Sequence, residues 1–190
     1  MKGFIVYPTY RIIDGKAFVY LFGRLENGES FLTINEFKPY FYIRKKDKKK
    51  LTELDTDIIY DIDSSEMKTF FENPVVKITL DLPRNVTILR DIFHKKDIPT
   101  YEADIRFVYR FMMDNGIKGS LDINGEQKIG NYVNRIYEGP LLTAAEYKPE
   151  LRILSLDIET SMDHKKLYSI SLFSNDFGKV LLVSDKKLNN

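Results

Sequence analysis

The chain has 190 residues, of which 43% are hydrophobic and 30% are charged, and its formal net charge is +1. This balance excludes a disordered polyelectrolyte, so any nucleic-acid surface has to come from local clustering of charge. The absence of cysteine excludes disulfides and thiolate zinc sites, and two histidines are too few for a histidine-based metal centre. No stretch approaches the roughly 20 apolar residues of a membrane span, and the N-terminus lacks the pattern of a signal peptide, so we expect a cytoplasmic protein without a membrane partner.

The first 43 residues predict a β-meander. Apolar and polar residues alternate in "GFIVYPTYRI", "KAFVYLFGRL" and "SFLTI", and the pairs Asp14-Gly15 and Asn27-Gly28 between them are strong hairpin signals. "KPYFYIR" continues the strands. The run "RKKDKKK" over 44–50 then predicts a solvated loop or helix face, with phosphate contact as the alternative.

The middle of the chain predicts alternating strands and helices. We expect strands at 57–62, 74–82 and 99–104, and helices at 64–73, where a serine can cap the start, and at 84–96, where the apolar spacing is helical. Alternation of this kind predicts a small α+β sandwich of the ferredoxin or RRM type. A further helix over 105–116 ends at Gly116, and short β-like pieces fill 117–145.

The polar segment "EYKPE" over 146–150 predicts a domain boundary, which divides the chain into 1–146 and 147–190. Three strand candidates follow, "LRILSLDIET", "LYSISLFS" and "KVLLVS". In the first of them Asp157 and Glu159 are two residues apart and therefore point to the same side of a strand.

Two carboxylates this close repel each other, and burial without partners would be costly. A hard divalent cation, Mg²⁺ or Mn²⁺, removes both problems, and a pair of such ions is the usual device for cleaving phosphodiesters. The alternative is that Asp157 and Glu159 simply lie in water at a strand end. The spacing alone favours that alternative.

The surrounding residues resemble a known family. "LDIET" after an apolar strand is similar to the first exonuclease motif of family B DNA polymerases, and "EFKPYFY", "LPRNVTILRD" and "YEADIRFVYRFMMDNGI" resemble segments of the N-terminal domain of the archaeal members. The resemblance implies an α+β chain in which a β-rich N-terminal domain precedes the first strands of an RNase-H-like exonuclease fold. It also implies a prokaryotic intracellular setting.

In archaeal members of this family, those N-terminal segments form a pocket that captures uracil in the template strand. Carried over by position, the resemblance implies a base-binding pocket made of Tyr10, Pro39, Tyr40, Pro83, Val86, Ile105, Phe107 and Arg110. This sequence departs from the family at Arg106, where the family often has proline.

The resemblance implies that the chain is an N-terminal fragment of a DNA-directed DNA polymerase, and that Asp157 and Glu159 bind the metal ions of its 3′→5′ proofreading exonuclease. The second and third exonuclease motifs would lie beyond residue 190, so we expect the fragment alone to be inactive and to bind metal weakly. Its partners would be the template strand, the primer 3′ end and the rest of the polymerase, with any sliding clamp bound elsewhere. A stand-alone RNA- or single-stranded-DNA-binding module and a purely structural spacer remain alternatives.

Overall fold

The structure is a computed structural model that describes residues 1–184, with residue 53 described for its backbone only. The chain divides into two compact units between Pro149 and Glu150. Each unit is described by itself. No helix in the described part of the chain is both long enough and apolar enough to cross a membrane.

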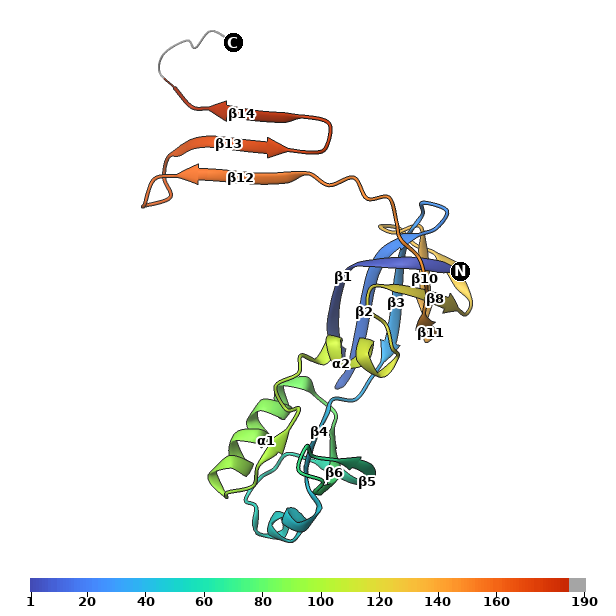
Figure 1. Cartoon of the computed structure of the whole chain (residues 1–190), viewed down its shortest axis with the longest axis vertical. Coiled ribbons are helices and arrows are strands. Elements are labelled where there is room, and N and C mark those ends of the chain that lie inside the picture. Colours follow the sequence, from blue (N-terminus) through green and yellow to red (C-terminus); the bar gives the residue numbers. More distant parts are fainter. Residues whose placement is uncertain (185–190) are drawn as a thin grey trace. The chain divides into compact units, whose positions relative to one another are not determined.

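The first unit contains a seven-stranded sheet in the order β11-β8-β1-β2-β3-β10-β9 (Figure 1). Its strands are β1 (Lys2–Ile13), β2 (Lys16–Leu25), β3 (Ser30–Glu36), β8 (Ser120–Asn124), β9 (Gln127–Ile129), β10 (Arg135–Glu138) and β11 (Leu141–Ala144). The two predicted hairpins join β1 to β2 and β2 to β3, as expected. Gly15 and Gly28 adopt φ angles of 77° and 85°, which glycine tolerates best.

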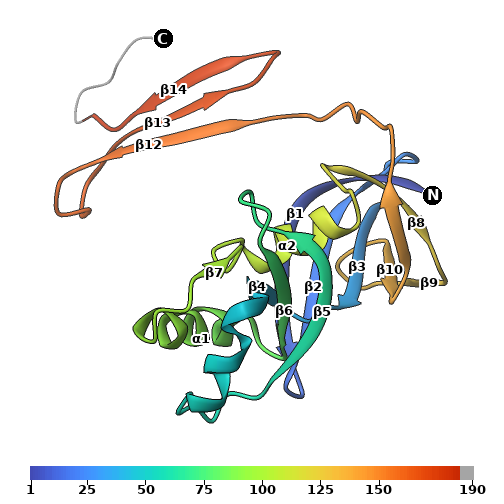
Figure 2. The same ribbon diagram turned by 60° about the horizontal axis from the view of Figure 1, so that its bottom comes forward.

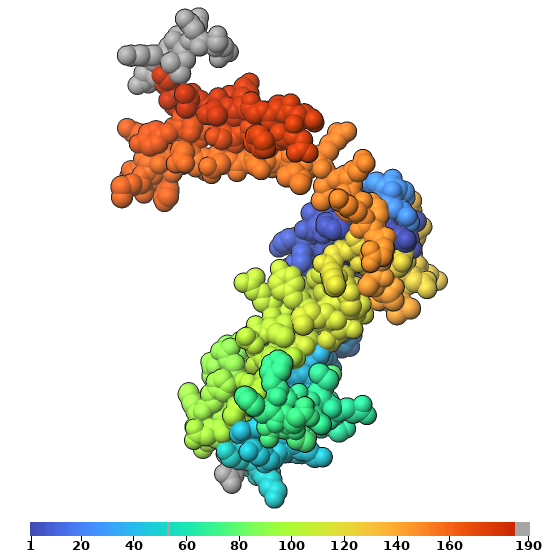
Figure 3. Space-filling model, viewed as in Figure 1, coloured from blue at the N-terminus to red at the C-terminus, as the bar shows by residue number. Residues whose placement is uncertain are grey.

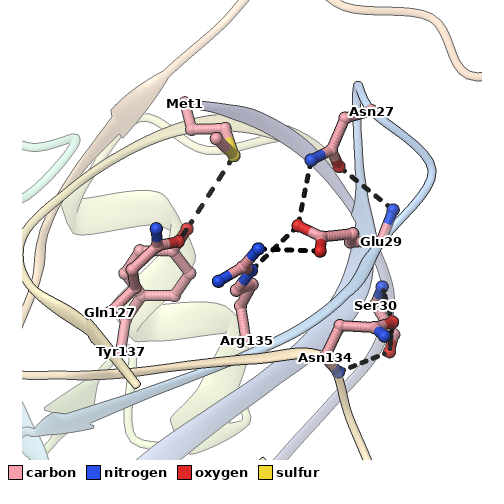
Figure 4. A network of polar contacts seen from close by, with 8 residues as sticks. All are labelled: Met1, Asn27, Glu29, Ser30, Gln127, Asn134, Arg135 and Tyr137. Atoms are coloured by element: carbon pink, nitrogen blue, oxygen red, sulfur yellow. Dashed lines mark hydrogen bonds and ion pairs between the residues drawn. The ribbon is translucent and has the colours of Figure 1, made fainter. Parts of the chain in front are cut away.

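One pairing in this sheet joins segments that are distant in the sequence. β10 runs parallel to β3, and side chains reinforce the pairing beside the β2–β3 turn (Figure 4). Arg135 donates from Nε and Nη2 to the two carboxylate oxygens of Glu29, each at 2.9 Å. Next to this pair, the backbone amide of Ser30 donates to the side-chain oxygen of Asn134 at 2.8 Å. These contacts attach the region after residue 130 to the N-terminal meander.

A second sheet of four strands, in the order β5-β6-β4-β7, completes the first unit (Figure 2). Its elements are β4 (Tyr40–Arg44), β5 (Tyr60–Lys68), β6 (Pro74–Leu80), β7 (Thr100–Tyr101), the 3₁₀ helix η1 (Lys45–Glu53) and the helix α1 (Pro83–Lys95). Leu89 and Phe93 of α1 are fully buried in one cluster with Phe41 and Ile78 of the sheet. The helix α2 (Phe107–Asp114) instead contributes Phe107, Phe111 and Met112 to the core of the seven-stranded sheet.

Two expectations for this region were wrong. Residues 64–73 do not form a helix, because β5 runs on to Lys68 and a turn follows. The hydroxyls of Ser65 and Thr69 accept hydrogen bonds from backbone amides two residues further on, at 3.1 and 3.3 Å, and such local bonds compete with a helix. The strand over 40–44 does not continue the meander either but lies in the second sheet. The ferredoxin-like arrangement is therefore not confirmed.

The second unit is an antiparallel meander of β12 (Ser155–Thr160), β13 (Leu167–Phe173) and β14 (Gly178–Leu182). The three strands and the turn before Gly178 agree with the sequence. They are the orange-to-red part of the space-filling view (Figure 3). β12 is exposed along almost its whole length, which differs from the buried strand that its apolar residues suggest.

Candidate functional site

A cavity of about 570 Å³ lies in the first unit, between the starts of the two helices and the neighbouring strands. This volume is typical of pockets that bind small molecules. The lining residues are Pro8, Thr9, Tyr10, Pro39, Tyr40, Pro83, Arg84, Val86, Thr87, Arg90, Ala103, Asp104, Ile105, Arg106, Phe107, Val108, Tyr109 and Arg110. All eight residues that the resemblance assigned to a base-binding pocket are among them, although they come from four segments of the chain.

Local sequence explains how α1 presents its residues to this cavity. Proline at the first helical position has no amide hydrogen to satisfy and a backbone angle that suits a helix start. Counting from Pro83, the lining residues Val86, Thr87 and Arg90 follow at the spacing of one helix face. The adjacent face of the helix carries Leu89 and Phe93 into the core, and Val86 packs against the same cluster.

Aromatic rings form one wall of the cavity. The ring of Phe107 is 5.3 Å from that of Tyr10 in an edge-on arrangement, and 5.4 Å from that of Phe37. Phe37 also contacts Tyr40 at 6.3 Å. Phe107 is buried, whereas Tyr10 is 43% exposed. The wall therefore has one ring that is fixed in the core, Phe107, and one ring that is partly exposed to a flat ligand group, Tyr10.

A buried cation lies beside this wall. Arg110 is 7% exposed, and its Nη2 donates to Oε2 of Glu102 at 2.6 Å. Burial opposes the charge, but the hydrogen bond to Glu102 and nearby negative groups leave the pKa of Arg110 raised. Its Nε is buried without a hydrogen-bond partner among residues 1–184. An orphaned buried donor of this kind is uncommon and costly.

Tyr40 links the wall to the buried cation. The guanidinium carbon of Arg110 is 4.8 Å from the centre of the Tyr40 ring, and Lys77 Nζ is 4.1 Å from the same centre. The Tyr40 hydroxyl donates to the carboxylate of Asp114, with distances of 2.8 and 2.9 Å to its two oxygens. Burial and this hydrogen bond raise the pKa of Tyr40, so the ring stays neutral and its face remains available to cations.

The cavity is strongly cationic. Four of its lining residues are arginines, and Asp104 is the one carboxylate in the lining. The resemblance named only Arg110 and singled out Arg106 as a departure. Arg84 and Arg90 were missed, although Arg90 shares the helical spacing of Pro83 and Val86. Nothing in the sequence indicated that Glu102, with its positive φ of 61°, would pair with Arg110.

The carboxylate pair lies in the second unit. Asp157 pairs with Ser171 of β13 and Glu159 with Ser169, while Ile158 between them pairs with Ile170. Strand geometry therefore gives the two carboxylates a common side, but both residues are exposed rather than buried. Their oxygens suit Mg²⁺, which accepts one or two carboxylates with water in the other positions. In the described part of the chain, however, no group of three or more acidic or histidine residues gathers in a metal-binding arrangement.

Comparison with known proteins connects these features to one family. The model of the DNA polymerase family B exonuclease domain matches residues 98–181, a range that begins in the first unit and extends into the second. The chain is 28% identical over 187 residues to a DNA polymerase of Methanocaldococcus jannaschii, covering 91% of this chain and 11% of the relative. It is 25% identical over 206 residues to a DNA polymerase of Archaeoglobus fulgidus, covering 98% of this chain and 26% of the relative.

A solved structure shares the fold. The family B DNA polymerase of Pyrobaculum calidifontis superposes with a TM-score of 0.71 at 21% identity, covering 97% of this chain and 27% of that one. The chain thus spans only about a tenth to a quarter of the polymerases it matches. The family match and the relatives together show that the chain is similar to the N-terminal and exonuclease region of family B DNA polymerases.

Proposed function

We propose that the first unit binds single-stranded template DNA and takes one unpaired base, uracil in preference to thymine, into the cavity. The observation that carries this proposal is that eight residues from four segments line one cavity with aromatic and apolar walls and a buried cation. The parent protein would be a DNA-directed DNA polymerase with a 3′→5′ exonuclease. Residues 1–146 would form its template-reading domain and residues 147–190 the start of its exonuclease domain.

The walls suit an extruded base. Stacking of a base on an aromatic side chain contributes roughly 1–3 kcal/mol, and Tyr10 offers an exposed ring for it. Uracil lacks the methyl group of thymine, and an added methyl in a close-packed pocket costs about 1–3 kcal/mol. Pro39, Pro83 and Ile105 supply the rigid apolar surface that such discrimination requires.

The structure favours this arrangement over an open RNA-recognition sheet. That alternative needs exposed aromatic side chains on the face of the four-stranded sheet that α1 does not cover. Tyr40 on this sheet is buried beneath Arg110, and Tyr42 beside it is half-buried. A purely structural spacer gives no reason for an unpartnered Arg110 Nε in a cavity.

The first test is a titration of the purified chain with fluorescent single-stranded DNA that carries one uracil, with the thymine version as control. We expect uracil to be preferred by about tenfold, which corresponds to roughly 1.4 kcal/mol. Val86→Gln, which places a polar amide in the cavity, should remove the preference for uracil. The first unit should stay folded, because Val86 is only half-buried. Tyr40→Ala should also remove it.

Tyr40 is buried, so circular dichroism must show that its variant is folded before its binding is interpreted. Ile88→Gln is a matched control for Val86→Gln, because Ile88 is an exposed α1 residue outside the cavity lining. Equal, weak binding of both oligonucleotides by the unaltered chain would disprove base selection.

For the second unit we propose that Asp157 and Glu159 form the first metal-binding motif of the proofreading exonuclease, with Mg²⁺ or Mn²⁺ as the ion and the primer 3′ end as the substrate. Their common side on β12 and the exonuclease match over 98–181 support this role. A bound divalent ion would activate water or stabilise the leaving oxygen during phosphodiester cleavage. The two carboxylates of the chain would hold the ion and keep its water-bearing positions open.

A two-carboxylate site predicts weak metal binding. We expect Mn²⁺ to bind the purified chain with a dissociation constant of about a millimolar, as measured by the paramagnetic relaxation of bound water. Asp157→Asn/Glu159→Gln should abolish this binding, and the exposed pair Asp55→Asn/Asp57→Asn should not change it. Processive 3′→5′ digestion of DNA by the chain alone would contradict the proposal that these residues are one part of a larger site.

A further inference from the structure

We propose that Arg84 and Arg106, at the starts of α1 and α2, hold backbone phosphates of the DNA strand whose base enters the cavity. This inference rests on the proposed function and adds a second recognition element to it. The base would be read by the apolar walls, and the strand would be fixed in register by a phosphate anchor at the rim. Phosphate contacts of this kind give affinity and position, whereas base contacts give selectivity.

The ends of both helices face the same cavity. Arg84 follows Pro83 in the first turn of α1, and Arg106 is the N-cap residue of α2; both residues line the cavity. Neither helix start has a side-chain cap within the described residues. The first amide groups of a helix point out of its N-terminus and carry a partial positive charge, so two uncapped starts around one cavity favour an anion there.

The arginines at these positions have no competing partner. Arg90 pairs with Asp91 at 2.9 Å and Arg110 with Glu102, but neither Arg84 nor Arg106 forms an ion pair with any carboxylate that the structure describes. Both are exposed and their planar guanidinium groups suit phosphate oxygens. A charged rim side chain that lacks a carboxylate partner remains available to an external anion.

An independent observation points to an acceptor in the same place. Arg110 is more than nine-tenths buried, lines the cavity, and leaves its Nε without a partner among residues 1–184. Satisfying this donor requires an acceptor that residues 1–184 do not supply in the structure. The cavity therefore offers a buried donor within and two cationic helix starts at its rim, opposed by the single carboxylate of Asp104.

The basic run on η1 is a weaker candidate for the anchor. Its buried Asp47 accepts a hydrogen bond from Arg44 at 2.7 Å and lies 3.7 Å from Lys50, so part of the charge is already neutralised within the run. The exposed lysines of η1 are not among the residues that line the cavity. They would attract DNA without fixing its register.

The test combines two variants with two oligonucleotides. Arg84→Gln/Arg106→Gln is compared with Arg24→Gln/Arg152→Gln, which removes the same charge at exposed positions outside the cavity. The DNA carries one uracil, either with natural phosphates or with neutral methylphosphonates on both sides of it. Dissociation constants are measured over a series of salt concentrations, and circular dichroism checks the fold of each variant.

We expect Arg84→Gln/Arg106→Gln to weaken binding of uracil and thymine oligonucleotides about equally, and to flatten the dependence of log K on log salt by about 0.7 for each lost contact, or roughly 1.4 in all. The methylphosphonates should weaken binding to the unaltered chain and to the control variant by about tenfold. They should leave binding to Arg84→Gln/Arg106→Gln unchanged, because the partners of those phosphates are already missing.

Failure of the anchor and failure of base reading give different results. If the phosphate anchor is wrong, both double variants change the salt dependence equally and the methylphosphonates weaken all proteins alike. If base selection is wrong, the unaltered chain binds uracil and thymine oligonucleotides equally, whatever the methylphosphonates do. If the unaltered chain prefers uracil but binds methylphosphonate DNA as tightly as natural DNA, the phosphate anchor is wrong and base selection stands.

Discussion

Replacing Gly23 with alanine should destabilise the first unit by about 3 kcal/mol, at the upper end of the cost of forcing extra atoms into a packed core. Gly23 lies inside β2, paired with Ile5 on one side and Phe31 on the other. A Cβ atom there would be 2.1 Å from the backbone oxygen of Phe4 and 2.5 Å from the ring of Phe31. Neither can yield easily, because one belongs to a paired strand and the other to a fully buried side chain.

Urea unfolding followed by far-ultraviolet circular dichroism measures this effect. Gly119→Ala is a suitable control, since its added Cβ would meet only the ring edge of Phe4 at 3.3 Å, and that half-buried ring can shift. The control should cost less than about 1 kcal/mol. Equal unfolding midpoints for the two variants would show that β1 and β2 do not approach each other as closely as described.

Local signals in the sequence predicted the elements that local interactions determine. The Asp14-Gly15 hairpin needs two residues with positive φ, and both have it, at 50° and 77°. The start of α1 at Pro83 and the residue after the C-cap of α2, Gly116 with a φ of 67°, follow equally local rules. These features would be recognisable in a short peptide of the same sequence.

The wrong or missing predictions concern choices between competing partners. Residues 64–73 have helical composition, but β6 offers a strand partner to β5, and hydroxyl-to-amide bonds at Ser65 and Thr69 stabilise the extended and turn conformations. The parallel pairing of β10 with β3 depends on residues about a hundred positions apart, which no short pattern reveals. The exposure of β12 is also unpredictable from its own residues.

The residues of the candidate site also divide into those that short motifs predict and those that depend on the packing of distant segments. The resemblance gave eight residues, and all eight line one cavity, because residues within one short motif stay close together in the fold. It could not give Glu102 as the partner of Arg110, or the meeting of Arg84 with Arg106 at one rim, since both depend on how the α1 and α2 starts are packed. Arg106, which departs from the family pattern, occupies a position that is chemically useful for a nucleic-acid ligand.

Breaking the ion pair between Arg110 and Glu102 should show whether the pair stabilises the fold or serves ligand binding. Glu102→Ala should cost about 2 kcal/mol of unfolding free energy, which is less than the 3–5 kcal/mol of a fully buried pair because Glu102 is 41% exposed. Arg110→Met should cost less, since its loss leaves a carboxylate that water can solvate. In the double variant the thioether fills the space of the arginine stem and no buried charge remains, so the two losses should not add. We expect a coupling of about 1–2 kcal/mol in urea unfolding.

The same three variants separate stability from binding. If Glu102→Ala/Arg110→Met is as stable as the unaltered chain yet has lost uracil binding, the pair contributes little to folding, and the arginine is required for the ligand. If the double variant is stable and still prefers uracil over thymine, the unpartnered Nε of Arg110 does not face the base, and the apolar walls alone discriminate. Additive losses in stability would contradict the direct contact between Arg110 and Glu102. The Lys77→Gln variant controls for loss of a cation over Tyr40, because Lys77 contacts the same ring but does not line the cavity.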